Sequence, residues 1–409
     1  MGLLHAVSLG KAVADDSIQT DIQAGDEDDP QPKRKFTKWN SFEGPVTSFK
    51  YGGGFLVDYA GYAQDHESKQ QVRLVPEAKL RDARILLDGQ FTTQRPITWC
   101  AGLMYDGPTH SWLVRQTGFM VGVPEIWSHF FIGRQKEGFS LNKVMVGYAG
   151  WTMERATISD ATIPILADGI KWMGLTPNHH FRWDLGIYGD TLSENETFST
   201  YDHQFVTRLN WLPIIPEGGG KDLLHLGVMA RYGEVDNDFL TMRSRPEAFA
   251  APYFVDTGKL ATGHTRMVGG EAYYRPGNWM FGSEYWLTSV AAPALDNPVM
   301  HGGDLVQTWV ITGETRPYNM VNGSFKTISP AKSFLDGGPG AWEAVLRESY
   351  IDLNGGTVQG GKFWRITPMV NWYISDQLRL EAAYGYGTLD RFGTQGHTHF
   401  FQLRLQIWI

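Results

Sequence analysis

Arginine side chains recur at alternate positions within the apolar stretches of this 409-residue chain. In the stretch FRWDLGIY, for example, Arg182 and Asp184 alternate with large apolar residues. A guanidinium group stays charged over the physiological pH range and offers a planar fork of donors, which matches phosphate and other oxyanions. A common polar surface lined by such groups could therefore bind or conduct anions.

The polar faces of these stretches carry more arginines than acids. The arginines are Arg84, Arg134, Arg182, Arg208, Arg231, Arg266, Arg347, Arg365, Arg379 and Arg404. The acids on the same faces are Asp58, Asp88, Asp184, Glu284, Glu314, Glu343 and Glu381. Two roles compete for each arginine: it lines a path for anions, or it pairs with a neighbouring acid.

The motifs of the common enzyme classes are absent from the sequence. No H-E-x-x-H, G-x-S-x-G or G-x-x-x-x-G-K-[ST] pattern occurs, so nothing anchors a metalloprotease, a serine hydrolase or a P-loop nucleotide site. His179 and His180 lack partners at metal-ligand spacing, and the single Cys100 excludes an internal disulfide. The formal net charge of −8 gives no basic footprint for nucleic acid. We therefore expect neither a catalytic site nor a cofactor.

The arginines occur in stretches whose apolar and polar residues alternate strictly. The closing stretch HFFQLRLQIWI places Phe401 and Leu403 on one face and Arg404 on the other. Because successive side chains of a β-strand point to opposite faces, this pattern predicts strands that bury one side. The apolar faces end in Trp and Tyr, as in the aromatic girdles of membrane barrels. The sequence has no run of about 18 apolar residues, which excludes a transmembrane helix.

About sixteen such stretches follow one another, which predicts a closed antiparallel transmembrane β-barrel. Short turns alternate with longer loops, as in outer-membrane barrels. The last strand should pair with the first, so that the sheet has no open edge. One long connection, 316–339, falls on the side of the short turns. The predicted strands are 46–62, 79–91, 96–106, 111–120, 126–135, 167–175, 180–190, 202–213, 222–234, 263–274, 279–290, 304–315, 340–353, 362–374, 377–389 and 395–409.

The start of the chain differs from the rest. A short apolar run ends in small residues at Ala12 and Ala14, a pattern similar to a truncated secretory signal. The stretch that follows is first acidic and then basic and has no periodicity, which predicts a flexible leader. We expect residues 1–45 to form this signal remnant and leader, and residues 46–409 to form the barrel. A soluble β-sandwich is the rival fold.

Several motifs in the second half of the chain resemble the phosphate-selective porin O/P family. The stretch TGETRPYNMVNGSFKTISP carries that family's TGE-x-R-x-Y and G-x-F-x-x-I-x-P, and GAWEAVLRESYIDL carries its GAWE-x-x-x-R. Other similar pieces follow in the same order as in the family: LRDARILLDG, FIGRQKEGFSLNK, TMER and NWYISDQLRLEAAYGYG. The resemblance covers about residues 46 to 409.

This resemblance implies a homotrimeric, sixteen-stranded outer-membrane channel for anions, with a third loop that folds into the pore. It also implies that phosphate or pyrophosphate is the preferred species in some members. The expected partners are inorganic anions (phosphate, pyrophosphate or chloride), outer-membrane lipid, the barrel-assembly machinery and further copies of the chain.

The resemblance assigns candidate residues to the anion path. Arg134 matches the arginine of the strand that leads into the third loop. Lys143 matches the constriction lysine of that loop, and Arg155 matches its closing arginine. Arg81 matches one arginine of a pair near the second strand, and Arg84 lies on the polar face of that strand. The further lumen candidates are Arg182, Arg208, Arg231, Arg347, Arg379 and Arg404.

The chain departs from the family pattern at five positions. Gly54 and Asp82 replace arginines, and Arg84 replaces a tyrosine. Cys100 and Tyr148 stand where lysines are expected. Because the changes at Gly54, Asp82, Cys100 and Tyr148 remove positive or donor groups, we expect weaker discrimination for phosphate than in phosphate-selective relatives. The alternatives are a general small-solute porin and an outer-membrane barrel enzyme.

Overall fold

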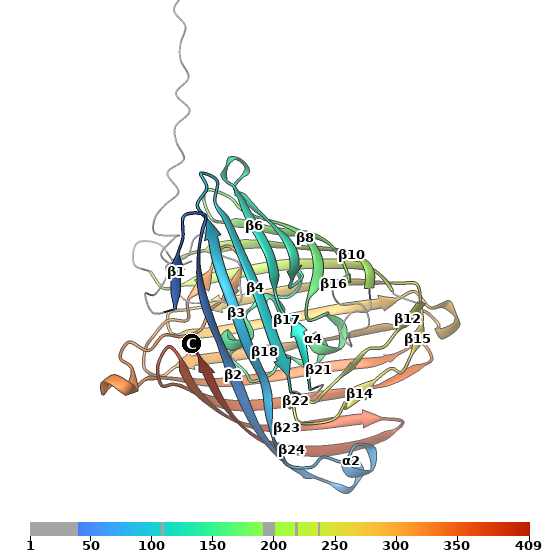
Figure 1. Cartoon of the computed structure of the whole chain (residues 1–409). Helices are drawn as coiled ribbons and strands as arrows, with labels where there is room; N and C mark the ends of the chain where they lie inside the picture. Colours follow the sequence, from blue (N-terminus) through green and yellow to red (C-terminus); the bar gives the residue numbers. More distant parts are fainter. Residues whose placement is uncertain (1–39, 108–109, 191–200, 217–219, 236–237) are drawn as a thin grey trace, which may run out of the picture.

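Sixteen long strands form a closed barrel in the computed structural model (Figure 1). The structure describes residues 40–107, 110–190, 201–216, 220–235 and 238–409. The main sheet has 18 strands, because β1 (Ser41–Glu43) adds a short strand beside β2 and one barrel strand is broken into β5 and β6. The barrel strands are β2 (Thr47–Gln64), β3 (Glu77–Phe91), β4 (Ile97–Asp106), β5 (Ser111–Val114) with β6 (Thr117–Val123), β7 (Ser128–Gln135), β8 (Ala167–Leu175), β9 (Phe181–Gly189), β10 (Tyr201–Ile214), β11 (Leu223–Val235), β16 (His264–Arg275), β17 (Trp279–Val290), β18 (Val299–Val310), β21 (Ala341–Gly355), β22 (Val358–Tyr373), β23 (Leu378–Arg391) and β24 (Thr394–Trp408).

The first and last barrel strands close the ring. β24 runs antiparallel to β2, with paired residues from Gly54 and Trp408 at one end to Gln64 and Thr398 at the other. With β5 and β6 counted as one strand, each barrel strand therefore has a neighbour on both sides, and the ring is closed. The predicted closed antiparallel barrel is confirmed.

The barrel is apolar outside and polar inside, the reverse of a soluble protein. On β17 and β18, Leu305 is 47% exposed, whereas Glu284 is 1% exposed. Indole rings stack on the outer surface, with ring centroids 5.1 Å apart for Trp279 and Trp309. This distribution suits a lipid-facing wall with interfacial aromatics and a polar interior.

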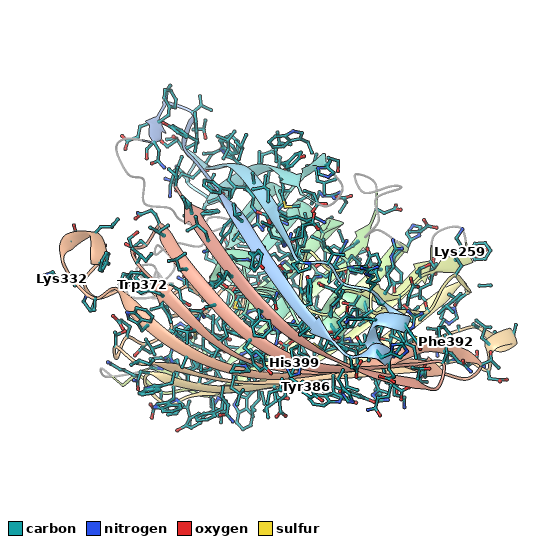
Figure 2. All side chains as sticks on the ribbon, turned by 90° about the horizontal axis from the view of Figure 1, so that it is seen from below. Lys259, Lys332, Trp372, Tyr386, Phe392 and His399 are labelled. Carbon is teal, nitrogen blue, oxygen red and sulfur yellow. The ribbon has the colours of Figure 1, made fainter. Side chains whose placement is uncertain are left out.

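The two ends of the barrel are marked by different connections (Figure 2). Lys332 and Trp372 lie at one end, here called the turn end, where most connections are short. Lys259 and Phe392 lie at the opposite end, here called the loop end. The helices are short: α2 (His66–Gln71), α3 (Leu141–Val144), α4 (Thr157–Thr162), and the 3-10 turns η1 (Pro124–Ile126), η2 (Gly147–Ala149), η4 (Pro293–Leu295) and η5 (Phe334–Asp336). In the described part of the chain, no helix has the length and apolar character to cross a membrane.

Three details differ from the sequence prediction. Arg266 was expected inside, but it shares the outward face of β16 with Val268, which is 58% exposed, while the neighbouring Met267 is 3% exposed. Glu314 follows the end of β18, which spans Val299–Val310 instead of 304–315, so this acid lies in a connection and not on a strand. β1 lies within the expected leader, whose residues 1–39 fall outside the described part of the chain.

Residues 136–166 contact side chains from strands that are far apart around the ring. The backbone amide of Leu141 donates to Glu271 on β16, and the carbonyl of Trp151 accepts from Asn371 on β22. The carbonyl of Gly150 accepts from Arg379 on β23 at 2.8 Å. A segment with such contacts lies across the interior of the barrel, and its α4 contacts β18 and β21.

The connection 311–340 also enters the barrel, from the turn end. It carries the two-stranded hairpin β19 (Tyr318–Asn319) and β20 (Ser324–Phe325). Arg208 on β10 donates to the carbonyl of Gly323 at 2.7 Å, and the ring of His225 on β11 bonds to the hydroxyl of Tyr318 at 2.6 Å. The unusual length of this connection is explained by a hairpin that packs inside the wall.

A third segment, 238–263, completes the filling at the loop end. It forms two short ribbons, β12 (Phe239–Leu240) with β15 (Leu260–Ala261), and β13 (Arg243–Ser244) with β14 (Val255–Asp256). α4 contacts β13, so this segment packs on residues 136–166.

Candidate functional site

A cavity of about 480 Å³ lies between β3, β4 and the two interior segments 136–166 and 238–263. Nine basic side chains line it, against five acidic ones. The basic residues are Arg81, Arg84, Arg115, Lys136, Lys143, Arg155, Arg243, Arg245 and Lys259. The acidic residues are Asp82, Asp106, Glu154, Asp160 and Glu247. The cavity wall is therefore basic although the whole chain is acidic.

A smaller cavity of about 40 Å³ adjoins the large one. Both are lined by Arg81, Asp82, Arg84, Gly147, Glu154 and Arg155. These shared residues form what we call the neck. A Cβ atom placed on Gly147 would lie 3.2 Å from Nη2 of Arg84, so the space at the neck depends on the glycine.

A bulge in β3 turns Arg81 toward the neck. Leu56 pairs with Asp82 and Val57 pairs with Leu80, so Arg81 is an extra residue in its strand. A bulge of this kind lets two successive side chains face the same side. Arg81 then donates from Nε and Nη2 to the carboxylate of Glu154 at 3.0 and 3.2 Å.

Two of the five departures from the family pattern, Asp82 and Arg84, belong to the neck, and Tyr148 lies next to it. Arg84 donates to Asp82 at 3.1 and 2.9 Å, and its guanidinium carbon lies 4.4 Å from the centre of the Tyr148 ring. The Tyr148 ring lies 4.4 Å from that of Trp408. A Cβ atom at Gly54 would approach the Trp408 ring to 2.9 Å, so a larger residue there would displace the indole. An ion pair and two contacting aromatic rings thus occupy the positions where the family pattern has further positive groups.

The fifth departure, Cys100, lies elsewhere. It belongs to a buried apolar cluster with Met120, Phe131 and Met173. A lysine at this position would place its stem among these side chains. The apolar cluster therefore explains the cysteine by packing.

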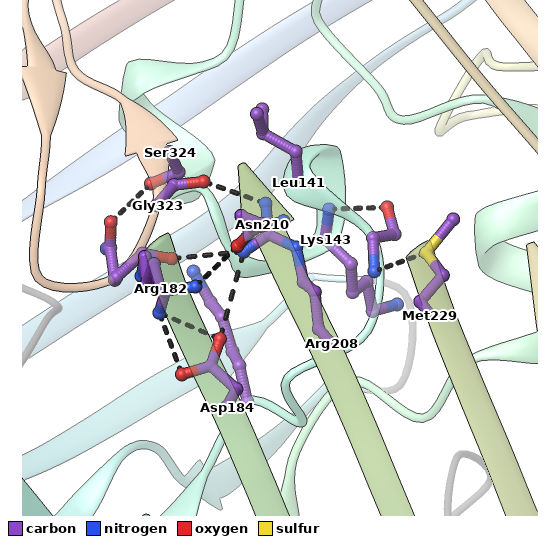
Figure 3. A network of polar contacts seen from close by, with 12 residues as sticks. Leu141, Lys143, Arg182, Asp184, Arg208, Asn210, Met229, Gly323 and Ser324 are labelled. Carbon is purple, nitrogen blue, oxygen red and sulfur yellow. Dashed lines mark hydrogen bonds and ion pairs between the residues drawn. The ribbon is translucent and has the colours of Figure 1, made fainter. Parts of the chain in front are cut away.

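Seven of the strand arginines predicted for the lumen are held in ion pairs, whereas Arg365 on β22 donates to the backbone carbonyls of Pro246 and Glu247. Figure 3 shows Arg182 bonded to Asp184 and, with Arg208, directed toward the hairpin at Gly323 and Ser324. The pairs are Arg134–Asp168 (3.6 Å), Arg182–Asp184 (2.7 Å), Arg208–Glu271 (2.7 Å), Arg231–Glu137 (3.2 Å), Arg347–Glu247, Arg379–Glu381 (3.3 Å) and Arg404–Asp58 (2.6 Å). Of these arginines, only Arg404 lines either cavity. The geometry of these seven arginines therefore shows pairing with acids, which was the alternative to lining a path for anions.

Arg155 lies on an interior segment, and backbone carbonyls hold it instead of an acid. Its Nε donates to Asn142 at 2.9 Å and its Nη2 to Met145 at 2.8 Å. No ion pair among the described residues includes Arg155, and it lines both cavities. Its positive charge therefore faces the neck without a direct ion pair, although Asp160 and Glu154 are close enough to act on it.

Lys143 lines the large cavity but is 3% exposed. Its Nζ donates to the carbonyl of Ile163 at 3.0 Å. Burial lowers the pKa of Lys143 to about 7, with Asp160 opposing the shift and Arg155 adding to it. The ammonium is therefore charged below about pH 7 and neutral above it.

The sequence analysis found part of this site and missed the rest. It identified Arg81, Arg84, Lys143 and Arg155, which the structure brings together, and it also proposed Arg134, which lines neither cavity. The missed basic residues are Arg115, Lys136, Arg243, Arg245 and Lys259. The alternation of cations and aromatics in RSRPEAFAAPYF (243–254) is the signal that could have pointed to the 238–263 segment.

Comparisons with known proteins place this chain among outer-membrane porins. The family model described as phosphate-selective porin O and P matches residues 49–409. A protein of Caulobacter vibrioides, described as uncharacterized, is 29% identical over 170 residues, which are 41% of this chain and 34% of that protein. This chain therefore matches only about a third of the length of that relative.

Solved structures with low sequence identity share the fold. The outer membrane channel DcaP of Acinetobacter baumannii has a TM-score of 0.57 at 9% identity, over 90% of this chain and 99% of that one. The anion-selective porin from Comamonas acidovorans has a TM-score of 0.55 at 10% identity, over 89% and 100% of the two chains. At this identity the likeness supports the barrel fold alone.

A valine at Gly147 should narrow the neck. The added side chain points at Arg84, so we expect Gly147→Val to reduce single-channel conductance several-fold in planar bilayers. The matched control is Gly263→Val, because a Cβ there meets only Oδ1 of Asp238 at 3.9 Å. Unchanged conductance in a folded Gly147→Val barrel would show that ions do not pass this point.

The charge state of Lys143 should make anion preference depend on pH. Since its pKa is about 7, raising the pH from 6 to 8 removes a positive charge beside the cavity. We expect the anion-to-cation permeability ratio of the wild type to fall over this range, and the ratio of Lys143→Met to stay nearly constant. Lys332→Met changes an exposed lysine at the turn end and should keep the wild-type profile. Identical profiles for the wild type and Lys143→Met would remove Lys143 from the conduction path.

Proposed function

Because this chain belongs to the phosphate-selective porin O and P family of bacterial outer-membrane porins, we propose that it forms a passive diffusion channel that prefers anions. The observation that carries the proposal is the charge of Arg155, which makes no ion pair among the described residues, at the neck of a cavity lined by nine basic and five acidic side chains. A fixed positive charge repels cations and offers donors to anions that shed water.

The permeant species proposed for this channel are inorganic anions, namely chloride, phosphate and pyrophosphate. Discrimination for phosphate should be weak, because Asp82 neutralises Arg84 and Tyr148 replaces a positive group at the neck. A general small-solute porin without anion preference is the alternative within the same fold. The match to a porin family favours a channel over a barrel enzyme.

The proposed assembly is a homotrimer in the outer membrane, inserted by the barrel-assembly machinery and surrounded by lipid. The broken strand β5–β6 supports a protein contact on this side, because Trp112 and Phe119 are 57% and 50% exposed on irregular strands. Residues 46–409 are proposed as the barrel domain and residues 1–45 as its leader. Native mass spectrometry in mild detergent measures the number of copies.

Arg155 is the residue whose removal should weaken anion preference most clearly. A unit charge about 4 Å from an ion in water is worth about 1 kcal/mol, or about fivefold in permeability. We expect Arg155→Met to lower the anion-to-cation permeability ratio by about this factor, measured as the zero-current potential in a KCl gradient.

The control for this experiment is Arg95→Met. Arg95 is an exposed arginine at a short turn, where it pairs with Glu125 at 2.8 Å, and it lines neither cavity. This variant should keep the wild-type potential. A cation-selective wild type would overturn the proposed function.

A further inference from the structure

Cations and aromatic rings alternate along the wall of the large cavity, from the loop end toward the neck. The guanidinium carbon of Arg243 lies 4.3 Å from the centre of the Tyr253 ring, and that of Arg245 lies 4.7 Å from the same ring. Arg245 also lies 5.8 Å from the Phe249 ring, and Arg81 lies 4.2 Å from it. All five residues line the cavity. We call this series the cation–ring ladder.

The outer part of the ladder carries positive charge without a paired acid. Neither Arg243 nor Arg245 takes part in an ion pair among the described residues, and Arg245 donates only to the backbone carbonyl of Ala251 at 2.9 Å. At the rim, Lys259 lies 5.9 Å from the ring of Phe239, which is 53% exposed. Arg243, Arg245 and Lys259 therefore each lie beside an aromatic ring.

Arg243 and Tyr253 are half-buried, and their shared stack forms part of the cavity wall. Phe249 is 8% exposed, and its ring lies beside Arg81 and Arg245. A flat ligand can therefore reach the guanidinium and the phenol ring from the cavity.

The aromatic part of this wall offers little to a small inorganic anion, which interacts with the cations alone. A planar organic anion can use both parts. Its ring stacks on a guanidinium plane or on an aromatic face, and its carboxylate accepts from a neighbouring guanidinium. A cavity of about 480 Å³ also lies within the size range of small-molecule sites.

On the basis of the proposed anion channel, we propose that the outer half of this cavity is a binding site for aromatic carboxylates. The ring of the ligand stacks against Arg243 or Tyr253, and its carboxylate pairs with Arg243 or Arg245. The ligand then lies above the neck, where the adjoining cavity has only about 40 Å³, and it obstructs the passage of smaller anions.

Chloride current through single channels in planar bilayers tests this site, with benzoate or cyclohexanecarboxylate added on the loop side. The two anions have the same charge and similar size, but only benzoate is planar and aromatic. We expect benzoate to block at a concentration at least about fivefold lower, the lower end of what one stacked ring contributes. Tyr253→Leu should remove the difference between the two anions, and Tyr253→Phe should keep it, each variant being compared with its own unblocked current.

Arg243→Met provides a second test that does not depend on how Tyr253→Leu folds. It should weaken block by benzoate more than block by cyclohexanecarboxylate. Equal block by the two anions in an anion-preferring wild type would overturn the aromatic site and leave the proposed channel function standing. A wild type without anion preference would instead overturn the channel proposal.

Discussion

A guanidinium group inside a barrel must find acceptors, and the interior of this protein is organised by that requirement. Arg208 pairs with Glu271 of a nearby strand and donates to the carbonyl of Gly323 in the inserted hairpin. Arg347 likewise contacts Glu247 of one interior segment and Thr152 of another. The same arginines thus neutralise buried acids and hold the segments that fill the barrel, which leaves open space mainly beside β3 and β4.

The positive charge that is available to a passing anion therefore lies on the interior segments and not on the barrel wall. A paired arginine presents little net field to a passing ion, whereas Arg155 is held by carbonyl groups and keeps its charge. The departures from the family pattern at and beside the neck touch one another, because Arg84, Asp82 and Tyr148 are in contact and the Trp408 ring packs at a tilt on that of Tyr148. A change at one of these positions alters the contacts of the others.

Strand alternation predicted the barrel, its closure and most strand bounds, because a wall between lipid and a polar interior imposes a period of two on every strand. The alternation gave wrong side-chain directions where a bulge interrupts a strand or where a strand ends. The bulge at Arg81 turns an additional side chain inward, and Arg266 follows the outward face of β16. Tertiary contacts between distant parts of the chain could not be predicted either, since nothing local in the sequence indicates that Arg182 meets Val321.

The central claim is that anions bind to the cations of the interior segments that make no ion pair, and not to the arginines of the wall that pair with acids. Bromide in crystals of the protein tests this directly, because its anomalous scattering locates bound anions. Bromide sites are expected beside Arg155 at the neck and beside Arg243 at the loop end, with none at the Arg182–Asp184 pair. Bromide bound along the paired wall arginines, with none at the neck, would contradict the claim.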